Sequence, residues 1–176
     1  KFEDHNGDGK VDGNDRHILG SIQPDFTYGF SSQFQYREFD ASITFAGSHG
    51  NKVYNALGRR LEQTGDSYNV LATVKDSWTA ENGGNTLPYA GNDRPFSHID
   101  SRYVQSASYL KLRNLTIGYR PRLPKTFPVA VRIYATATNL FTITPYKGYD
   151  PEVSGGTDRG AYPSARTFTF GVNLTL

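Results

Sequence analysis

The clearest pattern in the chain is the strict alternation of apolar and polar residues at positions 166–176. One side of the extended chain carries Phe168, Phe170, Val172, Leu174 and Leu176, and the other carries Thr167, Thr169, Gly171, Asn173 and Thr175. This period of two predicts a strand with one apolar and one polar face. A strand of roughly 9 to 11 residues suits the wall of a β-barrel that crosses a bilayer. A half-buried strand of a soluble sandwich gives the same alternation, so this segment alone leaves both folds open.

Two similar strands are predicted at residues 26–36 and 39–45. Their apolar faces hold Phe26, Tyr28, Phe30, Phe34 and Tyr36 in the first, and Phe39, Ala41, Ile43 and Phe45 in the second. Between them, Arg37-Glu38 leaves room only for a short hairpin turn. The opposite faces hold Gln, Ser, Thr and Asp, which are costly in a dry core and are at home in a wet lumen.

Two more strands are predicted at residues 108–119 and 129–138. In the first, Leu115, Ile117 and Tyr119 share one parity whereas Leu110 and Leu112 have the other, so either a β-bulge near Arg113 or a buried upper end of the strand is expected. These five strands cannot close a barrel, whose smallest members have about eight. The predicted fold is therefore all-β, an antiparallel arc of a larger transmembrane barrel.

The connections alternate between short and long. The turns at 37–38 and 120–128 are short, whereas 47–106 and 142–164 are long. Because outer-membrane barrels have short periplasmic turns and long extracellular loops, both long loops are expected outside the cell. Helical spacing of Val53, Tyr54, Leu57 and Leu61, and of Val70, Val74 and Trp78, predicts two short helices in the first long loop.

The first 15 residues fit a calcium-binding loop at every ligand position. The predicted oxygen ligands are Asp4, Asn6 and Asp8 at loop positions 1, 3 and 5, the Lys10 carbonyl at 7, Asp12 at 9 and Asp15 at 12. Gly9 stands where such a loop turns sharply. We therefore expect calcium as a structural cofactor, and divide the chain into an EF-hand-like or dockerin-like loop and connector at 1–24 and barrel strands with their loops at 25–176. A solvated acidic turn is the alternative.

Composition narrows the class of protein. With a mean hydropathy of −0.58 and no apolar run of about 18 residues, a transmembrane helix is excluded. The absence of cysteine excludes disulfides and thiolate chemistry. A net charge of +2 without a cluster of basic and aromatic residues argues against nucleic acid as a partner.

No catalytic motif is found, and the chain is not expected to be an enzyme. Asp150 and Glu152 flank Pro151 on one loop, and we interpret them as loop structure or partner contacts rather than as a glycosidase pair. Three tyrosines in the long loops, Tyr89, Tyr146 and Tyr149, either stack on sugar rings or pack within the loops.

Several motifs occur in an order that resembles the C-terminal end of SusC/RagA-type TonB-dependent outer-membrane transporters of Bacteroidetes. They are Asp4-His-Asn-Gly-Asp-Gly-Lys-Val-Asp12, Gly50-Asn-Lys-Val-Tyr-Asn55, residues 108–119, Asn139-Leu-Phe-Thr142, Gly148-Tyr-Asp-Pro-Glu152 and residues 168–174. The resemblance implies a barrel of about 22 strands with an N-terminal plug. It also implies a place in the outer membrane, contact with its lipid, energy supplied through TonB by a part absent here, and import of glycans or peptides beneath a SusD-like lipoprotein. Leu176 departs from the terminal Phe common in such barrels.

A second hypothesis is a soluble, calcium-stabilised, β-rich module at the cell surface that binds carbohydrate or mediates adhesion. The two hypotheses differ in the surroundings of Phe168, Phe170, Val172 and Leu174. In a transporter these side chains stay accessible to hydrocarbon, whereas in a soluble module a second sheet buries them.

Overall fold

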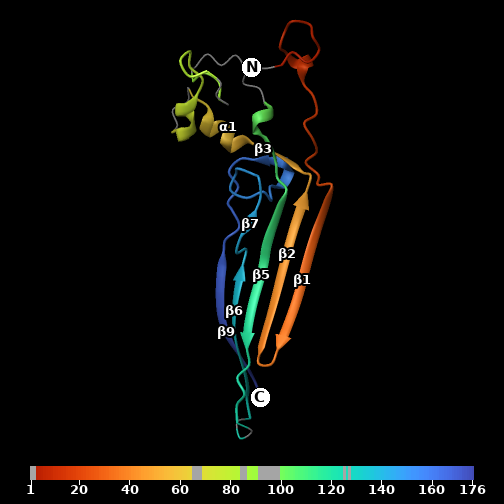
Figure 1. Ribbon diagram of the computed structural model, residues 1–176, viewed down its shortest axis with the longest axis vertical. Helices are drawn as coiled ribbons and strands as arrows, with labels where there is room; N and C mark the ends of the chain where they lie inside the picture. Colours follow the sequence, from red (N-terminus) through yellow and green to blue (C-terminus); the bar gives the residue numbers. More distant parts are fainter. Residues whose placement is uncertain (1–2, 65–68, 84–86, 91–99, 125, 127) are drawn as a thin grey trace.

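The fold is a curved sheet of long antiparallel strands with loops gathered at one end (Figure 1). The computed structural model describes residues 3–64, 69–83, 87–90, 100–124, 126 and 128–176. The long strands are β1 (Phe26–Tyr36), β2 (Phe39–His49), β5 (Tyr109–Tyr119), β6 (Ala130–Thr138) and β9 (Thr167–Thr175), hydrogen-bonded in the order β1-β2-β5-β6-β9. All five predicted strands are thus confirmed, each paired antiparallel with its neighbours.

The register aligns the alternating residues of all five strands into continuous rows. One row runs Phe34, Ala41, Ile117, Ala135, Phe170, and its neighbour runs Gln33, Ser42, Thr116, Thr136, Thr169. We call the side with the first row the apolar face and the side with the second row the polar face. Hydroxyl groups pair across the polar face, as between Thr116 and Thr136 with 2.9 Å between their Oγ1 atoms.

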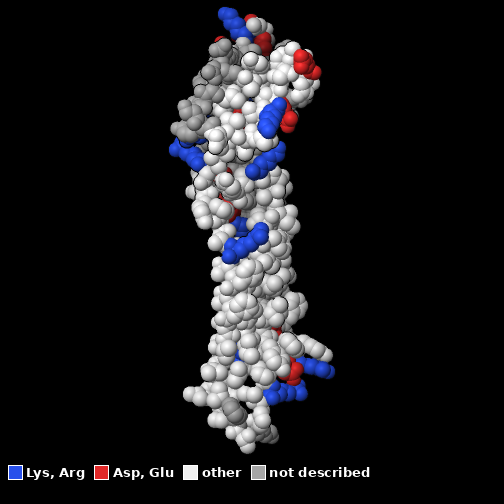
Figure 2. All heavy atoms as spheres, turned by 90° about the vertical axis from the view of Figure 1, so that its left-hand side faces the viewer, with Lys and Arg blue, Asp and Glu red and all other residues white. Residues whose placement is uncertain are grey.

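The apolar face is uncovered along β9. Phe168, Phe170, Val172 and Leu174 are between 58% and 81% exposed. No second sheet of the described residues packs against them, which is the arrangement expected of a barrel wall and not of a sandwich. Figure 2 shows a side of the molecule on which a band without charged side chains separates the charges of the upper part from those at the lower end.

A β-bulge lies where the sequence predicts it. Thr44 pairs with Asn114 but Phe45 pairs with Leu112, so Arg113 is the extra residue on β5. The bulge lets Leu110 and Leu112 above it and Leu115 and Ile117 below it share the apolar face, although their parities differ. Above the bulge β5 pairs with the short strand β7 (Thr142–Ile143) instead of β6.

The β6 ladder ends at Asn139, whose φ of 50° lies in the left-handed region that asparagine tolerates. Its backbone NH donates to the Arg113 carbonyl, and its side-chain amide donates to the Ala165 carbonyl at 3.1 Å. Asn139 therefore joins β5, β6 and the entry to β9 at the level where the wall gives way to loops.

Most of the buried apolar side chains among the described residues lie in the loops above the wall, which we call the loop layer, and Leu112 of β5 is the one on a wall strand. A second, three-stranded sheet has the order β4-β3-β8, with β3 at Lys52–Asn55, β4 at Val104–Ser106 and β8 at Thr157–Asp158. Val53, Ala107 and Tyr146 form its buried cluster. A wall strand with lipid on one side and a polar lumen on the other needs no such core, so the core forms where chain covers chain.

Two expectations for the first long loop need correction. Val53 and Tyr54 belong to strand β3, and the helix α1 covers only Ala56–Glu62, where Leu57 and Leu61 lie. Around Val74 the chain forms a short 3-10 helix, η2 (Ala72–Asp76), instead of an α-helix that would extend from Val70 to Trp78. Further 3-10 turns are η1 (Gly13–Asp15), η3 (Ser101–Tyr103) and η4 (Ser154–Gly156). None of the described helices is both long and apolar enough to cross a membrane.

The two ends of the sheet differ as the loop lengths predict. Both long loops and the loop with the predicted calcium ligands lie at one end, together with α1 and β3, and the short turns and the C-terminus lie at the other (Figure 1). On the polar face nearer the short turns, Arg132 of β6 reaches across β5 to Asp40 of β2, with 3.0 Å from Nε to Oδ1. The strand between them contributes Gly118, where a Cβ atom would lie 2.6 Å from Asp40 Oδ2. Glycine is therefore what allows this ion pair to cross a strand.

Candidate functional site: a polar cluster between loop and wall

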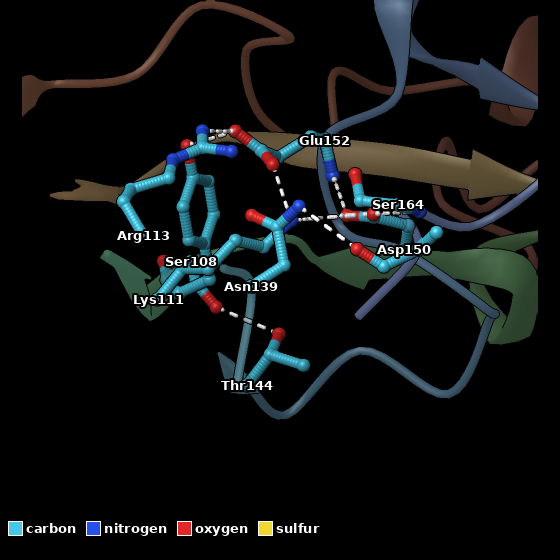
Figure 3. Close-up of polar contacts among 10 residues, drawn as sticks. Ser108, Lys111, Arg113, Asn139, Thr144, Asp150, Glu152 and Ser164 are labelled. Carbon is cyan, nitrogen blue, oxygen red and sulfur yellow. Dashed lines mark hydrogen bonds and ion pairs between the residues drawn. The ribbon is translucent and has the colours of Figure 1, made fainter. Parts of the chain in front are cut away.

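Five polar side chains meet where the second long loop crosses the polar face of β5. Tyr109, Lys111 and Arg113 come from β5, and Asp150 and Glu152 come from the loop; we call these five residues the loop-wall cluster. Lys111 Nζ donates to both oxygens of Asp150 at 3.2 Å and to Glu152 Oε2. The other Glu152 oxygen, Oε1, accepts from Tyr109 Oη at 2.7 Å and from Arg113. In Figure 3 the Lys111 side chain points from the strand toward both carboxylates.

Local sequence explains why these groups converge. Alternation places Tyr109 and Lys111 on the polar face of β5 while Leu110 and Leu112 lie on the other. On the loop, Asp150 Oδ1 accepts from the Glu152 NH and Asp150 Oδ2 accepts from the Ser164 NH, both at 3.1 Å. Asp150 thus fixes the turn around Pro151 and ties it to the far end of the same loop.

The cluster is charge-balanced, and its central lysine is removed from water. Lys111 is 1% exposed. Burial raises the pKa of Asp150, but hydrogen bonds from the backbones of Glu152 and Ser164 and from Lys111 outweigh it and lower the pKa below the ordinary 3.8. Burial likewise opposes ionisation of Glu152, but hydrogen bonds from Lys111, Tyr109 and Arg113 bring its pKa below the ordinary 4.5. Both acids are therefore anionic at neutral pH. The two cations on β5 and the two anions on the loop therefore hold these two segments together.

These pKa directions predict how the loop responds to acid. A carboxyl group whose pKa is lower in the folded state stabilises that state above its unfolded pKa, and the contribution is lost as pH falls through the folded value. The middle of the loop should therefore stay attached to the wall from neutral pH to about pH 5, and detach as pH drops below about 4. A fluorophore on Tyr162→Cys of the full-length receptor, followed by anisotropy, would report the change. In an Asp150→Asn/Glu152→Gln variant the anisotropy should be low at neutral pH and should not fall further with acid.

Asp150 and Glu152 thus join the loop to the wall, and a contact of either residue with a partner stays a prediction. Tyr146 is buried, and its hydroxyl donates to Asp158 Oδ2 at 2.6 Å. Asp158 Oδ1 accepts from the Gly160 and Ala161 NH groups. Burial raises the pKa of Tyr146, so it stays a neutral donor. Tyr146 therefore packs within the loop, whereas Tyr89 and Tyr149 are exposed.

The loop with the predicted calcium ligands is curled by its own backbone hydrogen bonds. Asp4 accepts from the Gly7 and Gly9 NH groups at 2.7 and 2.8 Å, and both glycines have positive φ. Asp15 accepts from the His5 NH at 2.8 Å and from the Asp12 NH at 2.7 Å, so the two ends of the loop meet. Hydrogen bonds from the backbones of Asp12 and His5 lower the pKa of Asp15.

The remaining predicted ligands of this loop follow the same local pattern. Asn6 Oδ1 accepts from the Asp8 NH, Asp8 Oδ1 accepts from the Lys10 NH, and Asp12 Oδ1 accepts from the Asn14 NH. Within the described ranges, no three or more His, Asp or Glu side chains are grouped so that they could hold a metal ion. Calcium binding stays a prediction.

Lys111 and Arg113 are the site residues that sequence reasoning missed. Their signal is a pair of cations two residues apart on the polar side of a predicted strand, matched by two acids with the same spacing at Asp150 and Glu152. A buried cation without a partner is costly, so two such pairs in a lumen-facing position are expected to bind each other.

Comparisons with known proteins agree with this architecture. No protein-family model matches the chain. The TonB-dependent receptor P3 of Formosa agariphila is 36% identical over 98% of the chain, and the TonB-dependent receptor SusC of Bacteroides thetaiotaomicron is 35% identical over 98%. The solved RagAB peptide transporter superposes with a TM-score of 0.83 over 94% of the chain at 26% identity. The chain belongs to the SusC/RagA type of TonB-dependent receptors.

The match covers only part of these relatives. The chain spans 18% of the length of the P3 receptor, 17% of SusC and 19% of the matched RagAB chain. Its sheet is accordingly an arc of the wall of a transporter barrel, as the alternating strands predict. The number of strands in the complete barrel stays a prediction.

Proposed function

We propose that the receptor to which this chain belongs imports a nutrient, a glycan or a peptide, across the outer membrane. The observation that carries the proposal is an uncovered two-faced sheet in a chain that aligns almost from end to end with TonB-dependent receptors. In this function the apolar face meets lipid and the polar face lines the lumen. The loops at 47–106 and 142–164 then lie outside the cell, where cargo and a SusD-like lipoprotein meet them.

Uptake by cells tests this function. A strain that lacks its own copy and expresses the full-length receptor should accumulate labelled oligosaccharides or labelled peptides, and accumulation should stop when TonB is removed. Uptake of one class identifies the cargo class. If neither class accumulates, or if accumulation is unchanged without TonB, the proposal is wrong. The names of the relatives describe receptors and transporters, and we propose no catalytic role for this chain.

We propose calcium as a structural cofactor of the loop at residues 4–15. Carboxylate and amide oxygens are the ligands that this cation prefers, and their spacing fits each numbered ligand position. Asp8→Ala in the full-length receptor should weaken calcium binding on the order of tenfold or more, because it removes one of four carboxylates. Glu3→Ala, just outside the loop, is the matched control and should bind as the wild type does. Isothermal titration of chelator-treated receptor measures both, and a wild type that takes up no calcium rejects the proposal.

A further inference from the structure

Contacts at the start, the middle and the end of the second long loop hold it to the wall, and the loop-wall cluster is the central one. At its start, Thr144 Oγ1 donates to the Ser108 carbonyl at 2.8 Å, and near its end the Asn139 amide holds the Ala165 carbonyl. These contacts fix both ends of the segment 144–166 to the wall (Figure 3). Between them the segment crosses the polar face, where Lys111 and Arg113 make its ion pairs to the wall.

Lys111 specifies one position of this segment. An ammonium group has three donors, and in Lys111 all three are used, two on Asp150 and one on Glu152. Tyr109 and Arg113 take the remaining Glu152 oxygen. A shift of the loop by one residue would leave a buried ammonium and two carboxylates without partners. The contacts thus favour one register of the loop on the wall and disfavour registers that are shifted by one residue.

Stability alone is a weak reason for this arrangement. A buried ion pair loses hydration on both sides, and well-packed apolar residues of similar size often stabilise a protein equally well or better. The charges instead restrict the segment to a single position on the wall. The segment that they fix carries two of the most exposed aromatic side chains of the chain, Tyr149 at 67% and Tyr162 at 93%. Tyr149 precedes Asp150 directly, and Tyr162 lies two residues before Ser164, which Asp150 also binds.

We propose that Lys111 is a positioning residue of the receptor, which holds segment 144–166 against the inner wall so that Tyr149 and Tyr162 present a fixed contact surface to the cargo. This rests on the proposed function, since the polar face must be the lumen for the segment to meet cargo. Tyrosine suits the role because it supplies a large amphipathic contact at a low cost in side-chain entropy. Lys111 itself is buried and acts through the segment.

A distance measurement on the full-length receptor tests the positioning role without transport. Nitroxide labels at Tyr162→Cys and at Gln33→Cys, on the polar face of β1, should give one narrow distance distribution by pulsed electron resonance. Lys111→Met should at least double its width, because two half-buried carboxylates then share one cation and the segment moves toward water. Lys111→Arg should restore a narrow distribution. Lys147→Met, an exposed lysine of the same loop, is the matched control and should leave it unchanged.

A second variant keeps the test decisive if Lys111→Met does not assemble. Glu152→Gln keeps shape and removes one charge, and should also broaden the distribution while the receptor still assembles. Broadening with an unchanged unfolding midpoint of the barrel supports positioning. A distribution as narrow as in the wild type overturns it, and so does broadening that appears only together with loss of the whole barrel.

Uptake measurements separate this inference from the proposed function. With the labelled cargo identified by uptake, Lys111→Met should raise the half-saturating concentration severalfold more than it lowers the maximal rate, and Lys111→Arg should recover most of the loss. A receptor that imports nothing, yet shows the expected broadening, contradicts the proposed function and not the role of Lys111 in fixing the segment. An unchanged half-saturating concentration despite broadening overturns the contact with cargo.

Discussion

Phe170→Arg is expected to destabilise the assembled receptor by about 2–4 kcal/mol, the cost of placing arginine on the lipid face near the bilayer midplane. Phe170 lies near the middle of β9, pairs with Ala135 of β6 and is 81% exposed on the apolar face. In a bilayer this exposure is contact with hydrocarbon. The urea midpoint of the full-length receptor in phospholipid vesicles measures the effect, together with the amount of folded receptor in outer membranes.

The neighbouring residue supplies the matched control. Thr169 is also exposed, but it lies on the polar face opposite Thr136. Thr169→Arg adds the same charge to the same strand and should shift the midpoint much less, since a polar lumen hydrates it. Equal effects of the two substitutions would contradict the assignment of the faces.

Gly148→Ala is expected to lower the free energy needed to open the loop layer by about 1–3 kcal/mol, the usual cost of overpacking a filled site. A Cβ atom at this position would overlap the ring of Tyr146. That ring cannot easily move aside, because it is buried beside Val53 and Ala107 and its hydroxyl is held by Asp158. Local opening should make tryptic cleavage after the exposed Arg159 about tenfold faster or more, since each 1.4 kcal/mol corresponds to a factor of ten.

Gly83→Ala is the control for this substitution. A Cβ atom there meets only Trp78 Nε1 at 3.9 Å, an ordinary contact. The rate of cleavage after Arg159 should therefore be unchanged in this variant. An unchanged rate in Gly148→Ala as well would show that Tyr146 is not the rigid centre of the loop layer.

The wall could be predicted from sequence because the face on which each side chain lies depends only on its position along its own strand. Each strand alternates between two solvents, so the faces of Phe170 and Thr169 follow from parity alone. Even the bulge at Arg113 was predictable, because Leu112 and Leu115 can share the apolar face only if one residue is inserted between them. The hairpin turn at Arg37-Glu38 followed from the two residues left between strands.

The loop layer could not be predicted in the same way, because its order comes from contacts between distant segments. Val53 fits a helical pattern with Leu57, yet it pairs in a strand with Gln105. This pairing of residues about 50 positions apart leaves no periodic trace in four residues of sequence. The partners of Lys111 lie 39 and 41 residues further along the chain, so only the folded wall shows that they meet. Tyr146 likewise meets Asp158 twelve residues along the chain, in a buried contact that no sequence pattern indicates.

The central claim is that the apolar face meets lipid, and site-directed labelling at Phe170 tests it most directly. The full-length receptor with Phe170→Cys, in isolated outer membranes, would be treated with a lipid-soluble thiol probe and, separately, with a membrane-impermeant one. The chain has no other cysteine, so any reaction within it reports this position. We predict labelling by the lipid-soluble probe alone. A receptor that is found in the soluble fraction, with residue 170 closed to both probes, would contradict the account and favour the soluble calcium-stabilised module.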